Sequence, residues 1–119
     1  MAEGKPISFD KFWAWLQRHP NCILRVGSPD AIVYDHEDYH WAFGLENDGT
    51  VFVQMIRGKR SIAEVFIDPR EITFVVIEPG ETDSEFLFNL RDSTEKTLFY
   101  FAMVHDFDEA STEVKPHWN

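Results

Sequence analysis

Histidines and carboxylates in two short polar segments are the residues of this chain best suited to metal chemistry. His36, Asp38 and His40 alternate along one segment, so an extended backbone would place their side chains on one face. Two imidazoles and a carboxylate form a ligand set that zinc and similar divalent ions accept. His105 follows the last apolar segment, and folding could bring it beside the other three. The pattern makes these four residues a candidate metal site, but a solvated polar turn is the interpretation that we favour.

Acidic residues form two clusters that could recognise a basic partner. The first cluster lies in a turn-forming segment after residue 78, and the second follows His105. The alternating ligands of a calcium-binding EF-hand loop are missing from the first cluster, and nothing selects a glycosidase pair from the 21 acidic residues. The clusters are either a recognition surface or ordinary solvated loops. The candidate partner-binding carboxylates are Glu81, Asp83, Glu85, Asp106, Asp108 and Glu109.

The sequence contains no catalytic motif and implies no cofactor. Cys22 is the only cysteine and begins an apolar segment, so we interpret it as a small core residue rather than a nucleophile. The basic segment 57–60 could grip a phosphate, but it lacks the glycine spacing of a nucleotide-binding loop and no helix follows it. We favour the interpretation that this segment is a charged hairpin turn. We therefore predict no catalytic residue.

Charge and composition narrow the classes of partner. The chain of 119 residues has 11 Lys and Arg against 21 Asp and Glu, a net charge of −10. The electrostatic field of a protein with this negative charge repels nucleic acid and anionic membranes, and it attracts basic proteins and peptides. No intrachain disulfide can form, and no apolar run approaches the roughly 18 residues that a membrane-spanning helix requires. We expect a cytoplasmic protein.

The candidate metal ligands and carboxylates must be positioned by regular secondary structure. The first such element is an N-terminal helix. Phe9, Phe12 and Leu16 recur at helical spacing, together with Trp13. Ser8 suits the N-cap position, and the sequence around Pro20 ends the helix. Trp15 lies off the main apolar stripe. It either extends the buried arc, which we favour, or is a partly exposed anchor for a partner.

Beyond this helix the pattern is mainly that of β-strands. The clearest segment is 39–45, in which aromatic residues alternate with small or polar ones. Segment 98–104 is apolar throughout, so periodicity does not separate strand from helix; its aromatic and β-branched content favours strand. The expected strands are 22–26, 31–34, 39–45, 50–57, 61–67, 72–77, 85–90 and 98–104.

These elements predict an α+β, mainly β fold: one N-terminal helix packed on a sandwich or curved partial barrel of seven or eight antiparallel strands. We expect one globular domain over 1–108 and a loosely ordered C-terminal tail over 109–119. The leading function is non-catalytic binding of a basic protein or peptide, as in an adaptor, inhibitor or immunity-like protein. The alternatives are a β domain that binds a small apolar ligand and a metal-dependent enzyme. A monomer or a homodimer fits, and an exposed sheet edge would permit strand addition.

Overall fold

The computed structural model describes residues 6–108. Within this range the chain forms one α-helix, two short 3-10 helices and eight β-strands. The elements in chain order are α1 (Phe9–Leu16), η1 (Pro20–Cys22), β1 (Ile23–Gly27), β2 (Ile32–Tyr34), β3 (His40–Leu45), β4 (Val51–Arg57), β5 (Arg60–Ile67), η2 (Pro69–Glu71), β6 (Phe74–Pro79), β7 (Phe86–Arg91) and β8 (Thr97–Met103).

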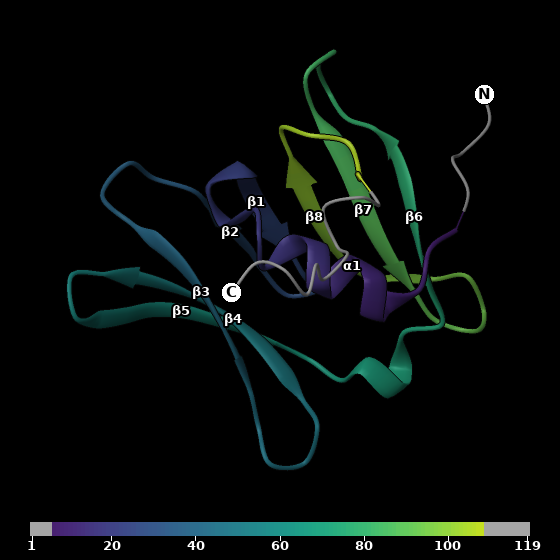
Figure 1. Ribbon diagram of the computed structural model, residues 1–119, viewed down its shortest axis with the longest axis horizontal. Coiled ribbons are helices and arrows are strands. Elements are labelled where there is room, and N and C mark those ends of the chain that lie inside the picture. The colour runs from purple at the N-terminus through teal and green to yellow at the C-terminus, as the bar shows by residue number, and fades with distance from the viewer. Residues whose placement is uncertain (1–5, 109–119) are drawn as a thin grey trace, which may run out of the picture.

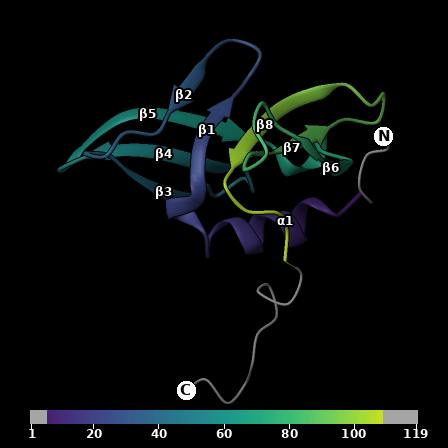
Figure 2. The ribbon, with the colours of Figure 1, turned by 90° about the horizontal axis from the view of Figure 1, so that it is seen from above.

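The strands form two antiparallel sheets, which confirms the predicted mainly β sandwich with an N-terminal helix. One sheet has five strands in the order β2-β1-β8-β7-β6, and the other has three in the order β3-β4-β5. In Figure 1 the three-stranded sheet lies at the lower left, and β8, β7 and β6 of the five-stranded sheet lie at the upper right. Seen from above, α1 covers one side of the molecule, while β2 and β5 lie on the opposite side (Figure 2). The helix therefore covers one side of the sandwich, and the edge strands β2 and β5 lie at the other.

Helix α1 begins and packs as its sequence predicts. The Ser8 hydroxyl oxygen accepts a hydrogen bond from the Lys11 backbone N–H at 3.1 Å, which satisfies one of the free donors of the first turn. Phe12 and Leu16 are completely buried. The Phe12 ring lies 5.3 Å from Phe88 of β7 and 5.2 Å from Phe101 of β8. The apolar face of the helix thus rests on the five-stranded sheet.

A single cluster of buried residues joins the helix to both sheets. The three-stranded sheet contributes Val53 and Ile67, which are at most 1% exposed. Fully burying one side chain of this size stabilises the fold by roughly 1.5–3 kcal/mol. Around the cluster lie half-buried apolar residues, among them Val65, Leu98 and Phe99. These three belong to the rim of the core rather than to its closed centre.

The ambiguous segment 98–104 is a strand, as expected from its composition. β8 occupies the centre of the five-stranded sheet, where both edges of a strand find partners. Asp92 and Glu95 resemble a helix-capping pair in sequence, but they form the β7–β8 turn instead. The Asp92 carboxylate accepts hydrogen bonds from the N–H groups of Thr94 and Lys96, and Glu95 adopts a positive φ of 69°. Thus the same polar residues close a hairpin here.

Among residues 6–108, no helix has both the length and the apolar character required to cross a membrane.

Candidate functional site

The predicted metal ligands of the first polar segment lie at the surface between β2 and β3. His36 and Asp38 are exposed, and the His36 Nδ1 atom lies 3.8 Å from an Asp38 carboxylate oxygen. The same nitrogen accepts a hydrogen bond from the Asp38 N–H at 3.1 Å, and the ring packs against Tyr39 at 4.9 Å. His40 begins β3 and is also exposed. These contacts are those of a solvated polar turn.

The fourth predicted ligand lies beside a different histidine. The His105 ring is 6.4 Å from the ring of His19, which follows α1. No group of three or more His, Cys, Asp or Glu side chains in the described part of the chain could hold a metal ion. The structure therefore does not assemble His36, Asp38, His40 and His105 into one site.

Trp15 is buried, so it is not the exposed partner anchor that one interpretation of the sequence allowed. Its side chain is completely inaccessible to solvent. The indole stacks on His19 at 4.5 Å and on Phe88 at 5.0 Å, and Phe107 lies 5.6 Å away. The spacing of apolar residues along the helix could not predict the burial of Trp15, because Phe88 and Phe107, which cover it together with nearby His19, come from distant segments of the chain.

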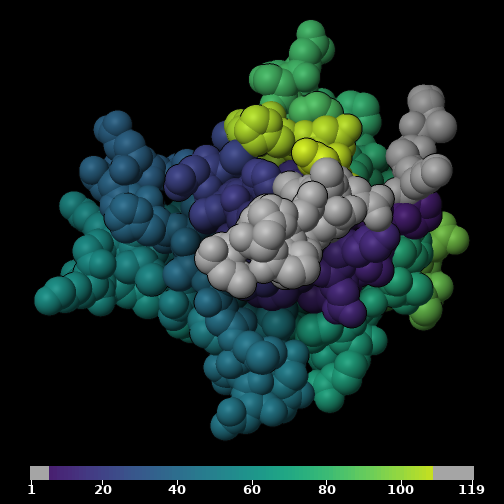
Figure 3. All heavy atoms as spheres, viewed as in Figure 1, coloured from purple at the N-terminus to yellow at the C-terminus, as the bar shows by residue number. Residues whose placement is uncertain are grey.

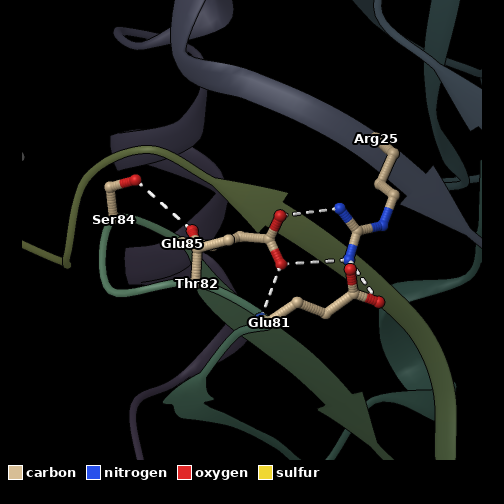
Figure 4. Close-up of polar contacts among 5 residues, drawn as sticks. All are labelled: Arg25, Glu81, Thr82, Ser84 and Glu85. Atoms are coloured by element: carbon tan, nitrogen blue, oxygen red, sulfur yellow. Dashed lines mark hydrogen bonds and ion pairs between the residues drawn. The ribbon is translucent and has the colours of Figure 1, made fainter.

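Glu85 is a structural residue rather than a carboxylate available to a partner. It is 8% exposed and makes a bidentate ion pair with Arg25 of β1, with Nη1 to Oε2 at 2.9 Å and Nη2 to Oε1 at 3.2 Å (Figure 4). The Glu81 backbone N–H also donates to the Glu85 carboxylate at 2.9 Å. The hydrogen bond from Arg25 and then the one from the Glu81 backbone lower the pKa of Glu85. The pair ties β1 to the β6–β7 turn.

The other carboxylates of the two predicted acidic clusters remain at the surface. Glu81 has an 82% exposed side chain, 4.0 Å from Arg25, and Asp83 is exposed too. The turn that carries them projects from the body as the green lobe at the top of Figure 3. Asp106 and Asp108 are exposed near the end of the described range, and Glu109 lies outside it. The turn around Glu81 is composed of polar residues, so it supplies charge without apolar surface.

A second charged network also stabilises the sheet. Arg91 of β7 donates from Nη2 to Glu78 of β6 at 3.1 Å, and the Asn89 amide donates to the other Glu78 carboxylate oxygen at 2.9 Å. Asn89 is only 7% exposed, so its hydrogen bond compensates for the loss of hydration. These polar side chains bond to one another across neighbouring strands. These contacts hold β6 and β7 in register, so we assign them a structural role.

Within the described residues, a hollow of about 580 Å³ that could admit a ligand lies between the two sheets. One wall is the strand β5, which contributes Ala63, Glu64, Val65 and Phe66. Because successive side chains of a strand point to opposite faces, four consecutive lining residues place the hollow along the edge of β5. We call this hollow the edge groove.

The opposite wall of the edge groove comes from the five-stranded sheet. The β1–β2 turn contributes residues 28–31, and β2 contributes Val33. Leu98 and Phe99 of β8 supply apolar side chains that also pack against the core. In Figure 2, β2 and β5 lie on the side away from α1. The helix therefore closes one side of the sandwich, and the groove lies at the other.

Three carboxylates line the edge groove: Asp30, Glu64 and Glu71. All three are exposed, and no Lys, Arg or His lines the groove with them. Glu64 accepts hydrogen bonds from Gln54 at 2.7 Å and from Ser61 at 3.5 Å, and both donors are neutral. Within residues 6–108 none of the three forms an ion pair. The groove thus combines apolar surface with three carboxylates that make no ion pair within the described residues.

Sequence reasoning missed these residues because they lie in four separate segments. One signal was available in segment 61–67, where Ile62 and Phe66 place apolar side chains on the face opposite Ala63 and Val65. Both are exposed, at 45% and 48%. Apolar side chains on both faces of a strand are shielded from water only if another element packs on each face. In the described structure Ile62 and Phe66, on the outer face of β5, remain exposed to solvent.

No protein-family model matches the chain, and neither a curated protein nor a solved structure is significantly similar to it.

Proposed function

We propose that this protein is a non-catalytic domain that binds a basic protein or peptide in the edge groove. The observation that carries the proposal is the coexistence, in one groove, of apolar residues with three carboxylates that make no ion pair in the described structure. The net charge of −10 extends this preference over the whole molecule. An adaptor, inhibitor or immunity-like role in the cytoplasm fits such a domain.

Apolar and acidic residues would contribute differently to binding. Two partner side chains of valine size buried on Val65, Leu98 and Phe99 gain roughly 3–6 kcal/mol before the costs of association. The rim carboxylates would raise the rate of encounter, and each exposed charge pair adds about 0.2–1 kcal/mol. Binding should weaken as salt screens the charges.

A small ligand is the second candidate occupant, and the size of the groove supports it. A volume of about 580 Å³ falls within the range of roughly 300–1,000 Å³ that small-molecule sites occupy. Such a ligand would place its apolar part against Leu98 and Phe99. The three carboxylates would favour a cationic group at its other end.

The proposal is tested with two triple variants that remove the same amount of charge. The groove triple is Asp30→Asn, Glu64→Gln and Glu71→Gln. The connector triple is Glu81→Gln, Asp83→Asn and Asp106→Asn, all exposed residues outside the groove. Binding of a synthetic library of lysine-rich peptides is measured by calorimetry at roughly 0.02 M and 0.15 M salt.

The groove triple should weaken binding about tenfold, whereas the connector triple should weaken it less than about threefold. An equal loss in both variants would mean that only the overall charge matters, and would overturn the groove as the site. Binding that is insensitive to salt would contradict a basic partner. Displacement by neutral apolar ligands, but not by peptides, would favour the second candidate.

A further inference from the structure

We propose that the edge groove takes an extended basic segment of the partner, which adds as a new strand to the free edge of β5. This inference rests on the proposed function and specifies how the basic partner is held. Backbone groups along an edge strand can hydrogen-bond to a further strand, and this mode of recognition needs little specific side-chain chemistry.

The two sheets have four edge strands in the described structure. Among them β5 is the longest, with eight residues, and it lines the edge groove. β5 pairs with β4 on one side, and its eight residues have no partner strand on the other side within the described structure. At the edges of the five-stranded sheet, β2 has only three residues, and two hydrogen bonds between Ile7 and Val75 cover part of β6. Short length and added pairing both limit strand addition at these other edges.

The composition of β5 leaves its edge open to a partner. Natural edge strands are commonly protected by lysine, by proline or by a bulge. Residues 61–67 contain neither lysine nor proline. The pairing skips Ile62, so an irregularity protects the end next to Arg60 but leaves 63–67 in regular register. These five residues span about 13 Å, enough to pair with about five residues of a partner.

The opposite wall of the groove also contains backbone groups that have no strand partner in the described structure. β1 pairs with β8 up to Gly27 and Tyr100, and then the chain leaves the sheet through the β1–β2 turn. Phe99 pairs with Leu90 of β7, the register skips Leu98, and both Leu98 and Phe99 line the groove on the other side. A segment lying along β5 would be enclosed between two strand edges instead of resting on a flat surface.

The register of β5 predicts the sequence pattern of the added strand. Ala63 and Val65 lie opposite Met55 and Val53 on the core side of the sheet, whereas Glu64 lies opposite Gln54 on the outer side. A strand paired with β5 would alternate between the same two sides. Apolar side chains would meet Val65 and the apolar residues of β8, and the intervening side chains would lie near Glu64. We therefore infer a segment in which Lys or Arg alternates with apolar residues.

Charge argues against a second copy of this chain as the occupant. Antiparallel pairing of two β5 strands would bring their Glu64 residues toward each other, between two molecules that each carry a charge of −10. Like charges on paired strands destabilise the pairing. A basic segment removes this repulsion and supplies the cation that Asp30, Glu64 and Glu71 lack.

The first test uses capped synthetic peptides of about seven residues in which Lys and Val alternate. One control peptide has the same composition in two blocks, and a second carries N-methyl groups on alternate backbone nitrogens. The alternating peptide should bind at least about tenfold more tightly than either control, because only it presents both the side-chain pattern and the backbone donors. Its binding should also slow hydrogen exchange at residues 63–66.

A pair of variants locates the site. Phe66→Lys places a cation on the β5 edge, and Leu45→Lys makes the same kind of change on β3, the other edge strand of the same sheet. Both side chains are exposed, at 48% and 71%, so both variants should fold, which their melting temperatures would verify. Phe66→Lys should weaken binding of the alternating peptide at least about tenfold, and Leu45→Lys less than about twofold.

The outcomes separate this inference from the proposed function. Equal binding of the alternating and block peptides, lost in the groove triple, would overturn strand addition while supporting a basic partner. Failure of every basic probe at low salt would overturn both. Dimerisation of the free chain that Phe66→Lys abolishes would assign the edge to a second copy and overturn this inference alone.

Discussion

The β6–β7 turn and the edge groove each carry three acidic residues, yet their environments differ. In the turn, Glu85 is buried against Arg25, and Glu81 and Asp83 extend from a projecting loop (Figures 3 and 4). In the groove, the carboxylates surround half-buried apolar residues and a free strand edge. The first region uses its one buried charge to hold the fold. The second keeps its charges available beside a surface that a partner could desolvate.

The difference shows that a cluster of acids is not sufficient to make a binding site. Exposed charges in a loop of polar residues interact with solvent and salt, so they increase encounter rates more than affinity. Affinity comes from residues that lose water on binding, and these need apolar neighbours. The two regions can be separated experimentally because their expected effects fall on different quantities, namely stability for the turn and partner affinity for the groove.

The largest expected effect is on stability. Arg25→Leu removes the cation that pairs with buried Glu85, and we expect the free energy of unfolding to fall by about 2–4 kcal/mol. Urea denaturation measures this change. Peptide binding by the folded fraction should be unaffected, because Arg25 does not line the groove. A variant as stable as the wild type would show that the ion pair contributes nothing to the fold.

Acid should reduce the stability difference between wild type and Arg25→Leu. The pKa of Glu85 lies below its ordinary value of 4.5 in the folded protein because of the hydrogen bond from Arg25. A lowered folded-state pKa contributes stability above the unfolded-state pKa, and this contribution is lost as the pH falls through the folded value. The difference in unfolding free energy should therefore be constant above about pH 5 and shrink below pH 4.5. A difference that grows in acid would contradict this linkage.

A smaller effect is expected from the apolar surface of the groove. Val65→Thr keeps the shape of the side chain but places a hydroxyl where a partner would bury it, which costs roughly 1–1.5 kcal/mol. The affinity for the alternating Lys-Val peptide should fall about five- to tenfold. Val104→Thr is the matched control, since Val104 is 37% exposed and lies outside the groove. Equal effects of the two variants would show that Val65 does not contact the peptide.

The smallest effect is expected in the β6–β7 turn. Glu81→Gln removes an 82% exposed charge whose nearest cation, Arg25, is 4.0 Å away and already paired with Glu85. The affinity for a basic peptide should change by less than about twofold, and its dependence on salt should be nearly unchanged. A loss of affinity larger than that of Val65→Thr, measured by the same calorimetry, would place the partner at the turn.

Local pattern in the sequence predicted most of the fold. The helical spacing of Phe9, Phe12 and Leu16, with Ser8 as N-cap, identified α1. Local pattern identified the strands, with composition rather than alternation deciding for 98–104, and every strand end lies within two residues of its expected position. These features depend on neighbours a few residues apart, which is why they can be read along the chain. The pair of Asp92 and Glu95 could not be assigned from local pattern, because a short polar pattern of this kind occurs both at helix caps and in hairpin turns. In the structure the Asp92 carboxylate stabilises a hairpin turn.

The sequence by itself determined the charge, the periods of the elements and therefore a mainly β fold with one helix, either a sandwich or a curved partial barrel; the tertiary structure decided for two sheets. Only the tertiary structure decided which carboxylate finds a cation, since Glu85 and Arg25 are 60 residues apart. It also decided that Trp15 is buried, and that four separate segments enclose the edge groove beside β5. The physical reason is that burial, pairing of charges and exposure of a strand edge depend on contacts between distant residues, whereas helical and strand periods depend on near neighbours.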